Sequence, residues 1–233
     1  MTDYKSDFSV MCYNVRCRDD FYKDNQIKIA KQILRESPDV VFLCEFHLSK
    51  SRKLDSIMQQ YGKYKQYYRS KSNCIFYSKY EIDNIKGIDT QTTNGVWAKN
   101  NLVHVFHPKG VVTIVGCHLS SSRKDIIGGY RNRVTETDSI YKALCDEKSP
   151  IIVMGDLNDV SGSYIVSRIK DIGLSDTWWE GGFGYGTTFH NKWLRLRLDH
   201  ILYPKDKLKL EIVKVIDSNL SDHNALIANF SFI

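Results

Sequence analysis

The chain has 233 residues and a mass of 27.0 kDa; 42% of the residues are hydrophobic and 26% are charged, and there are only 4 Pro. This composition is ordinary for a globular protein and excludes disordered, collagen-like and disulfide-scaffold classes. Lys and Arg outnumber Asp and Glu to give a net charge of +6, which suits a polyanionic partner without requiring one. The length fits one domain over residues 1–233.

The first part of the chain reads as a β-α-β unit. Residues 8–15 have the pattern of a strand, and residues 25–36 carry apolar side chains at helical spacing. Residues 39–45 (DVVFLCE) form an almost wholly apolar run, as expected for a strand that is buried on both faces. A second helix is predicted over residues 50–60.

Strands dominate the rest of the chain. Strand patterns run over residues 64–68, 73–78, 81–88, 102–107, 111–118, 151–156, 194–203, 208–216 and 225–232. Helices are predicted over residues 129–146 and 163–171. Because strands outnumber helices and several strands are apolar on both faces, the pattern favours two packed sheets covered by helices.

The cysteines are expected to be reduced thiols. They are Cys12, Cys17, Cys44, Cys74, Cys117 and Cys145, and none forms a Cys-x-x-Cys pair. Four of them fall inside apolar strand patterns, which is typical of core thiols in a reducing compartment. No stretch of the sequence approaches the roughly 20 apolar residues that cross a bilayer. We therefore expect a soluble monomer in the cytoplasm, or the soluble part of a membrane-anchored parent protein.

Polar residues of catalytic type stand where the apolar strands end. They are Asn14, Glu45, His118, Asp156 with Asn158, and Asp199, and the loop before the last strand adds Asp222 and His223. A carboxylate at the end of a buried run is unfavourable unless it is paired or binds a cation. One such residue alone would more often be a strand-end hydrogen-bonding group. If all these strand ends share one edge, they form an oxygen-rich pocket suited to Mg²⁺ and a phosphate ester.

Six short motifs support this interpretation by their identity and order. They are YN ending at Asn14, CE ending at Glu45, GCHLSS from Gly116, GDLND from Gly155, RLDHIL from Arg197 and SDHNAL from Ser221. This ordered set resembles the endonuclease/exonuclease/phosphatase superfamily, which includes deoxyribonuclease I, exonuclease III type abasic-site endonucleases, neutral sphingomyelinases and inositol polyphosphate 5-phosphatases. The resemblance spans essentially the whole chain. It implies an α/β (α+β) fold, a four-layer α-β-β-α sandwich of two mixed sheets, and divalent-metal hydrolysis of phosphodiesters or phosphomonoesters.

The metal ligands are predicted from the preference of hard cations for oxygen. Glu45 is the best candidate for a direct Mg²⁺ ligand, because Mg²⁺ keeps several waters and needs few protein groups. Asn14 and Asp222 are expected to complete or steer that shell. Mn²⁺ is a possible substitute for Mg²⁺.

The catalytic groups are predicted from their chemistry. Asp156 would orient the attacking water and could deprotonate it, while Asn158 would donate to a phosphoryl oxygen. His223 would contact the phosphoryl group and be held in its tautomer by Asp199. His118 would supply a further donor from the opposite side. The reaction would be in-line attack of water on phosphorus.

Strand alternation adds one expectation. In KWLRLRLDH, Arg195 and Arg197 project to the same face as Asp199, so both arginines would line the approach to the site and hold substrate phosphates. The alternative, favoured equally, pairs them with acidic surface residues. His200 lies on the other face and is expected to be a core histidine.

A second basic cluster follows His118. It comprises Arg123, Lys124, Arg131 and Arg133. A solvated loop and helix face is the favoured interpretation, because charge runs usually face water. A substrate-binding patch is the alternative.

The substrate class stays open at this stage. His118 stands in HLSS where abasic-site endonucleases carry a tyrosine, which favours the deoxyribonuclease, sphingomyelinase and phosphatase branches. We predict a phosphodiesterase or nuclease, with a phosphate ester and possibly nucleic acid as partner. The alternatives are a phosphomonoesterase, a sphingomyelinase-type lipid phosphodiesterase, and an inactive module that binds nucleic acid or phospholipid. A dinuclear metallophosphoesterase is disfavoured, because its DxH and GNH-type motifs are missing.

Overall fold

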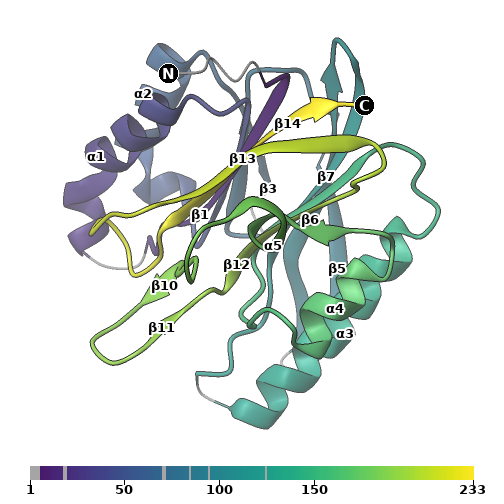
Figure 1. Cartoon of the computed structure of the whole chain (residues 1–233). Coiled ribbons are helices and arrows are strands. Elements are labelled where there is room, and N and C mark those ends of the chain that lie inside the picture. The colour runs from purple at the N-terminus through teal and green to yellow at the C-terminus, as the bar shows by residue number, and fades with distance from the viewer. Residues whose placement is uncertain (1–5, 18–19, 70–71, 84, 94, 124) are drawn as a thin grey trace.

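Two six-stranded β-sheets pack face to face, and helices cover their outer faces (Figure 1). The computed structural model describes residues 6–17, 20–69, 72–83, 85–93, 95–123 and 125–233. The layers run helix, sheet, sheet, helix, which confirms the predicted α-β-β-α sandwich. Figure 1 shows helices α1 and α2 on one side of the molecule and α3 and α4 on the other.

The first sheet is built from both ends of the described chain. Its strand order is β13 (Leu208–Ile216), β14 (Ala225–Phe232), β1 (Phe8–Asn14), β2 (Val40–Cys44), β4 (Cys74–Ser78) and β3 (Lys65–Arg69). Strands β1 and β2 are parallel, and the other neighbours are antiparallel. The helices that cover it are α1 (Asp20–Glu36) and α2 (Arg52–Gly62), with a short 3-10 turn, η1 (Leu48–Lys50), before α2.

The second sheet comes from the middle of the chain. Its strand order is β5 (Lys86–Thr92), β6 (Gly95–His107), β7 (Gly110–His118), β8 (Ile151–Asp156), β12 (Asp199–Tyr203) and β9 (Ser175–Asp176). Strands β7 and β8 are the parallel pair here. Helices α3 (Ile126–Leu144) and α4 (Tyr164–Lys170) cover the outer face. A short helix, α5 (Thr177–Gly181), and a hairpin of β10 (Phe189–His190) and β11 (Arg195–Leu196) complete the set.

Alternation along the central strands divides the core into layers. On β1, Val10 and Cys12 lie between the sheets, whereas Met11 and Tyr13 pack beneath α1 and α2. Because both faces of these strands are buried, their sequences are apolar at nearly every position. The apolar runs in the sequence therefore predicted the central strands correctly.

Three predicted strands differ from the structure. The strand expected over residues 102–107 begins earlier, because β6 runs over Gly95–His107. The strand expected over residues 81–88 lies instead over Lys86–Thr92, and Ile82 forms only an isolated bridge with Val105. The strand expected over residues 194–203 is split into β11 and β12, because β11 pairs with β10 in the hairpin whereas β12 pairs with β8. Residues 197–198 between them are irregular.

All six cysteines carry free thiols, and five of them are buried, as expected for core thiols. Cys145 is exposed. Among the described residues, no helix is both long enough and apolar enough to cross a lipid bilayer.

Candidate active site

The two parallel strand pairs end at the same edge of the sandwich, and the predicted polar residues gather there. Asn14 at the end of β1 stands in register with Cys44, so Glu45 follows directly beside it. In the second sheet, Asp156 pairs in register with both His118 and Asp199. The ends of five strands from both sheets therefore converge on one place.

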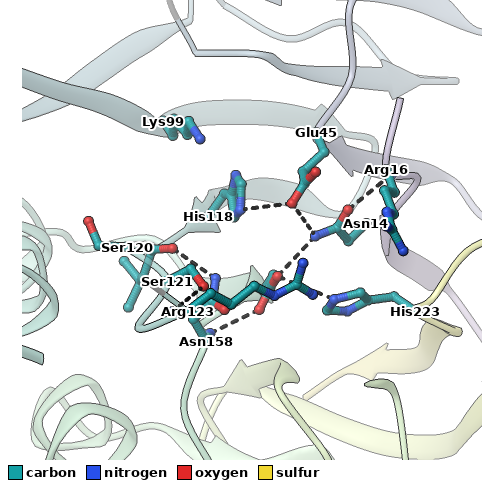
Figure 2. A network of polar contacts seen from close by, with 12 residues as sticks. Asn14, Arg16, Glu45, Lys99, His118, Ser120, Ser121, Arg123, Asn158 and His223 are labelled. Atoms are coloured by element: carbon teal, nitrogen blue, oxygen red, sulfur yellow. Dashed lines mark hydrogen bonds and ion pairs between the residues drawn. The ribbon is translucent and has the colours of Figure 1, made fainter. Parts of the chain in front are cut away.

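Two carboxylates of the site meet at one amide. The Asn14 Nδ2 group donates to Asp156 Oδ2 at 3.0 Å and to Glu45 Oε1 at 3.3 Å (Figure 2). Glu45 takes a left-handed backbone with φ of 51°, which turns the chain sharply after β2. Because such a conformation is unfavourable for a residue with a Cβ, it marks a position that the surrounding structure holds in place.

Asp156 is held by the turn that follows it. The Asn158 backbone N–H donates to Asp156 Oδ1 at 2.9 Å, and Asn158 has a φ of 49°. The Asn158 side-chain amide donates to the Leu119 carbonyl at 2.9 Å, and the Leu119 N–H donates to the Asp156 carbonyl at 3.0 Å. We call residues 156–159 the Asp156 turn and residues 118–123 the His118 loop. These hydrogen bonds join the turn to the loop.

His223 and Asp199 form a buried pair. His223 Nδ1 lies 2.7 Å from Asp199 Oδ2, and His223 Nε2 lies 3.7 Å from Asp156 Oδ2. Burial alone would lower the pKa of His223, but the carboxylates of Asp199 and Asp156 outweigh it and raise the pKa to about 9. The ring is therefore protonated at neutral pH. Asp199 is therefore placed as the carboxylate partner of His223.

Burial changes Asp156 as well. Desolvation raises the pKa of this carboxyl to about 6, although the positive charge of His223 and the hydrogen bond from Asn14 oppose the rise. Asp156 thus stays ionised at neutral pH and is more basic than an exposed aspartate. A carboxylate in this state can accept a proton from water.

His118 lies on the opposite side of the pocket from His223 (Figure 2). Its Nε2 is 3.7 Å from Glu45 Oε1, and its backbone N–H donates to Asn100 Oδ1 at 3.1 Å. The side chain is only 4% exposed. The two histidines therefore flank the carboxylates from both sheets.

Asp222 pairs with two arginines. Its Oδ2 accepts from Arg16 Nη1 at 2.8 Å and lies 3.3 Å from Arg123 Nη2, so two guanidinium groups hold this carboxylate. Asp222 lies in a bend, and the next residue, His223, is the one whose ring faces Asp156. Asp222 is thus an anchor for arginines.

Arg197 follows the alternative in which it pairs with an acidic residue, although that partner, Asp176, is buried rather than on the surface. It donates to both oxygens of Asp176, at 3.0 and 2.8 Å, and its Nη1 lies 3.1 Å from His200 Nδ1. Regular alternation would have placed Arg197 away from His200, but the chain is irregular between β11 and β12. The guanidinium is buried in this ion pair and does not line the approach to the site.

Arg195 and His200 complete the predicted group. Arg195 is exposed on β11 and lines a cavity of about 520 Å³ beside the hairpin, together with His190 and Trp178. His200 is fully buried, and its Nε2 lies 3.0 Å from the Asp159 carbonyl, as expected for a core histidine.

The sequence reasoning missed several side chains of the site. In the basic cluster after His118, Arg123 and Arg131 are exposed as expected, but Arg123 also reaches Asp222 and lies over the Phe189 ring at 5.4 Å. Arg133 is buried rather than solvated. Lys124 lies outside the described residues. Arg16, which follows Asn14 closely in the sequence, could have been found by its proximity to that motif (Figure 2).

The family assignment agrees with this geometry. A model of the endonuclease/exonuclease/phosphatase family matches residues 11–223. The chain belongs to the endonuclease/exonuclease/phosphatase family. It is therefore a member of a family of phosphoester hydrolases, and the two-sheet sandwich is the deoxyribonuclease I-like fold.

Solved structures with this fold come from several sources. TDP2 from D. rerio, complexed with a single-strand DNA product, has a TM-score of 0.77 and 17% identity, covering 96% of this chain and 98% of that one. A functionally unknown conserved protein from Enterococcus faecalis V583 has a TM-score of 0.76 and 15% identity, with coverages of 97% and 100%. Sphingomyelinase C from Streptomyces griseocarneus has a TM-score of 0.72 and 16% identity, with coverages of 95% and 98%. No curated protein sequence matches the chain significantly.

The donor set of this family member fits a hard divalent cation. Glu45 and Asp156 offer carboxylate oxygens around the Asn14 amide, and oxygen is the ligand that Mg²⁺ prefers. Asp156, Asp199 and His223 also bring ligand atoms within 4.8 Å of one another. That second group is less suited to a cation, because His223 carries a proton and its Nδ1 faces Asp199.

Proposed function

We propose that the chain is a divalent-metal-dependent phosphodiesterase. The observation that carries this proposal is the meeting of Asp156 with Asn14 at 3.0 Å and with His223 at 3.7 Å, in a polar cluster that also includes Glu45. A basic carboxylate, a protonated imidazole and a set of oxygen ligands are the groups that hydrolysis at phosphorus requires.

Glu45 and Asp156 would hold the cation, which would supply positive charge against the phosphoryl oxygens when bound. Asn14 would steer this site by aligning the two carboxylates through its Nδ2 group. Asp156 orients the water and takes its proton as the water oxygen forms a bond to phosphorus. The bond from phosphorus to the leaving oxygen breaks on the opposite side, and that oxygen takes a proton from solvent. Asp199 holds the His223 ring so that Nε2–H faces the pocket and donates to a phosphoryl oxygen.

The second N–H of the Asn158 amide and the His118 ring would serve as further donors to the phosphoryl group. Because the Asn158 amide already donates one hydrogen bond to Leu119, its orientation is fixed before substrate binds. Asp222 is proposed to act through Arg16 and Arg123, the two cations at the mouth of the site.

Nucleic acid is the substrate class that we place first. The chain has a net charge of +6, and Arg123 stands at the mouth of the site with 59% of its side chain exposed. A fold neighbour was solved with a single-strand DNA product. A lipid or monoester substrate is the alternative, and the assay below separates the three.

The test compares wild type with Asp156→Ala, using Asp146→Ala as a control that removes an exposed aspartate at the end of α3. Each protein is assayed with Mg²⁺ and with Mn²⁺ on bis-p-nitrophenyl phosphate, plasmid DNA, RNA, sphingomyelin and inositol phosphates. We expect metal-dependent diester cleavage that Asp156→Ala lowers by about 10³-fold or more and Asp146→Ala leaves unchanged. Unchanged activity in Asp156→Ala, or turnover of monoesters alone, contradicts the proposal.

A further inference from the structure

Helix α3 carries two buried charged side chains behind the active site that the proposed reaction does not use. Arg133 is 6% exposed and Glu136 is fully buried. Charged groups are seldom buried unless they are paired and hydrogen bonded, because desolvation is costly. The hydrogen-bond partners of these two residues therefore indicate which part of the structure they hold in place.

Glu136 binds one residue of the His118 loop with both of its oxygens. Its Oε2 accepts the Ser120 backbone N–H at 2.8 Å, and its Oε1 accepts the Ser120 hydroxyl at 2.5 Å. A carboxylate that receives two hydrogen bonds from one residue fixes both the position and the rotation of that residue.

Arg133 joins the same loop to the Asp156 turn. Its Nη1 donates to the Ser120 carbonyl at 2.9 Å and to Ser122 Oγ at 2.7 Å, while its Nε donates to Asp159 Oδ2 at 3.1 Å. One guanidinium thus spans the segment that presents His118 and the segment that presents Asp156. The Asn158 amide closes the connection through its hydrogen bond to Leu119.

We propose that Glu136, in its ionised form, is a positioning residue that holds the His118 loop for catalysis, with Arg133 bracing the loop against the Asp156 turn. The proposal rests on the proposed phosphoesterase function. Glu136 does not touch substrate; it acts through Ser120. The ionised carboxylate accepts both hydrogen bonds of Ser120, whereas a protonated carboxyl would accept only one and would have to donate to the Ser120 hydroxyl instead.

The charges around Glu136 leave its protonation finely balanced. Burial raises the pKa of this carboxyl to about 7, while the two hydrogen bonds from Ser120 and the positive charges of Arg133 and Lys99 oppose the rise. Arg133 faces Glu136 from its own helix and Lys99 faces it from β6, and Asp159 lies beyond Arg133. Activity should therefore fall as the pH drops below about 7, because Glu136 becomes protonated.

The test is a double-mutant cycle of Glu136→Gln, Ser120→Ala and the double variant, assayed on the substrate that wild type cleaves best. Gln keeps the shape of the side chain and one acceptor but cannot accept both hydrogen bonds of Ser120. We expect kcat to fall about 10-fold in each single variant, with KM changed less than about 3-fold. The kcat of the double variant should be no lower than that of the single variants, because both changes disrupt the same contact between Glu136 and Ser120. Additive losses would overturn the proposal.

Two further measurements separate positioning from general damage. Thr137→Val alters the neighbouring buried residue of α3 without touching Ser120, and it should keep wild-type kcat and the wild-type pH profile. In Glu136→Gln the acid limb of kcat should move from near pH 7 to the lower pH set by Asp156, whose pKa is raised to about 6. An unchanged limb would refute the role of the ionised form.

Hydrogen exchange gives a readout that does not depend on activity. Glu136→Gln should speed amide exchange in residues 118–123 at least about 10-fold and leave the central strands unchanged. If wild type shows no hydrolytic activity but the His118 loop exchanges faster in Glu136→Gln, the proposed function is refuted and the bracing role stands. Unchanged exchange in the loop would refute the bracing role even in an active enzyme.

Discussion

At the scale of single residues, the site is organised by two buried groups whose surroundings raise both of their pKa values. Asp156 becomes a stronger base because it is desolvated, and His223 keeps its proton because two carboxylates face it. The pair thus holds an ionised acid and a protonated base side by side at neutral pH. Neither state follows from residue type alone, since each depends on the other residue.

We expect Asp199→Asn to retain the position of the His223 ring but to remove the charge that keeps it protonated. The pKa of His223 should fall, because the charge of Asp199 is lost while burial continues to lower the pKa. We predict that kcat falls about 10²-fold to 10⁴-fold, as at other sites where a buried aspartate orients a histidine. The check is kcat against pH combined with NMR titration of the ring. A ring that still titrates near pH 9 would contradict this account.

Glu45→Gln tests the metal site. The amide removes one negative charge from the proposed ligand set, so the Mg²⁺ concentration at half-maximal activity should rise about 10-fold to 100-fold. Titration of activity with Mg²⁺ after treatment with EDTA measures this. Glu81→Gln, which changes an exposed glutamate, serves as the control and should show the wild-type Mg²⁺ curve.

At the scale of elements, the site depends on tight contacts between neighbouring strands. Gly155 has a φ of 134°, and a Cβ at this position would stand 2.1 Å from the Cys117 carbonyl oxygen on β7. A side chain therefore cannot be accommodated without separating β7 from β8. This close approach sets the distance between His118 and Asp156, which end those two strands.

Gly155→Ala should consequently destabilise the protein by about 3 kcal/mol or more and lower activity in the fraction that folds. Urea unfolding followed by circular dichroism measures the change. Gly162→Ala is the matched control, because Gly162 also has a positive φ, of 81°, but open space around the would-be Cβ. It should cost only about 1 kcal/mol. Equal losses in the two variants would show that strand spacing is not the cause.

The elements also show where sequence reasoning succeeded and failed. Central strands that are buried on both faces appear in the sequence as apolar runs. Their ends, and the polar residues that follow, could therefore be predicted. Arg197 was misplaced because two-residue alternation holds only within an unbroken strand, and the break after Leu196 is set by the pairing of β11 with β10. The ion pair of Arg133 with Asp159 joins residues on different elements, and no local pattern announces such a partner.

Asp222 illustrates the same limit at a motif. The motif SDHNAL identifies Asp222 as a candidate residue but does not show where its side chain points. That direction follows from the path of the chain after β13 and from the ion pairs with Arg16 and Arg123. Arg123 in turn reaches the site because its loop is held by α3. Residue type and order thus predicted which residues lie near the site. Which of these residues pair with each other could be seen only in the three-dimensional structure.

At the scale of the whole molecule, Glu136 should make global stability depend on pH. Its pKa is about 7 in the folded chain and 4.5 as the ordinary value, so between these pH values the folded state binds more protons than the unfolded state. The contribution of Glu136 to the free energy of unfolding is then greatest below about pH 4.5 and is lost as the pH rises to about 7. The shift corresponds to ~3 kcal/mol.

Urea unfolding at pH 5 and pH 8 checks this. Wild type should lose ~3 kcal/mol more than Glu136→Gln between the two pH values, because the amide does not titrate. Asp156 and His223 contribute losses of the same sign in both proteins and cancel in the comparison. Parallel stability curves for the two proteins would show that Glu136 does not titrate in this range.

The order of the sheets along the chain has a consequence for biogenesis. The second sheet is continuous in sequence, but the first is assembled from β1 to β4 and from β13 and β14, with Phe8 pairing with Phe230 across nearly the entire chain. During synthesis on the ribosome, the middle layer can therefore fold while β1 still waits for its partner β14. Since His223 arrives with that last strand, a nascent polypeptide would remain catalytically silent until translation has passed this point.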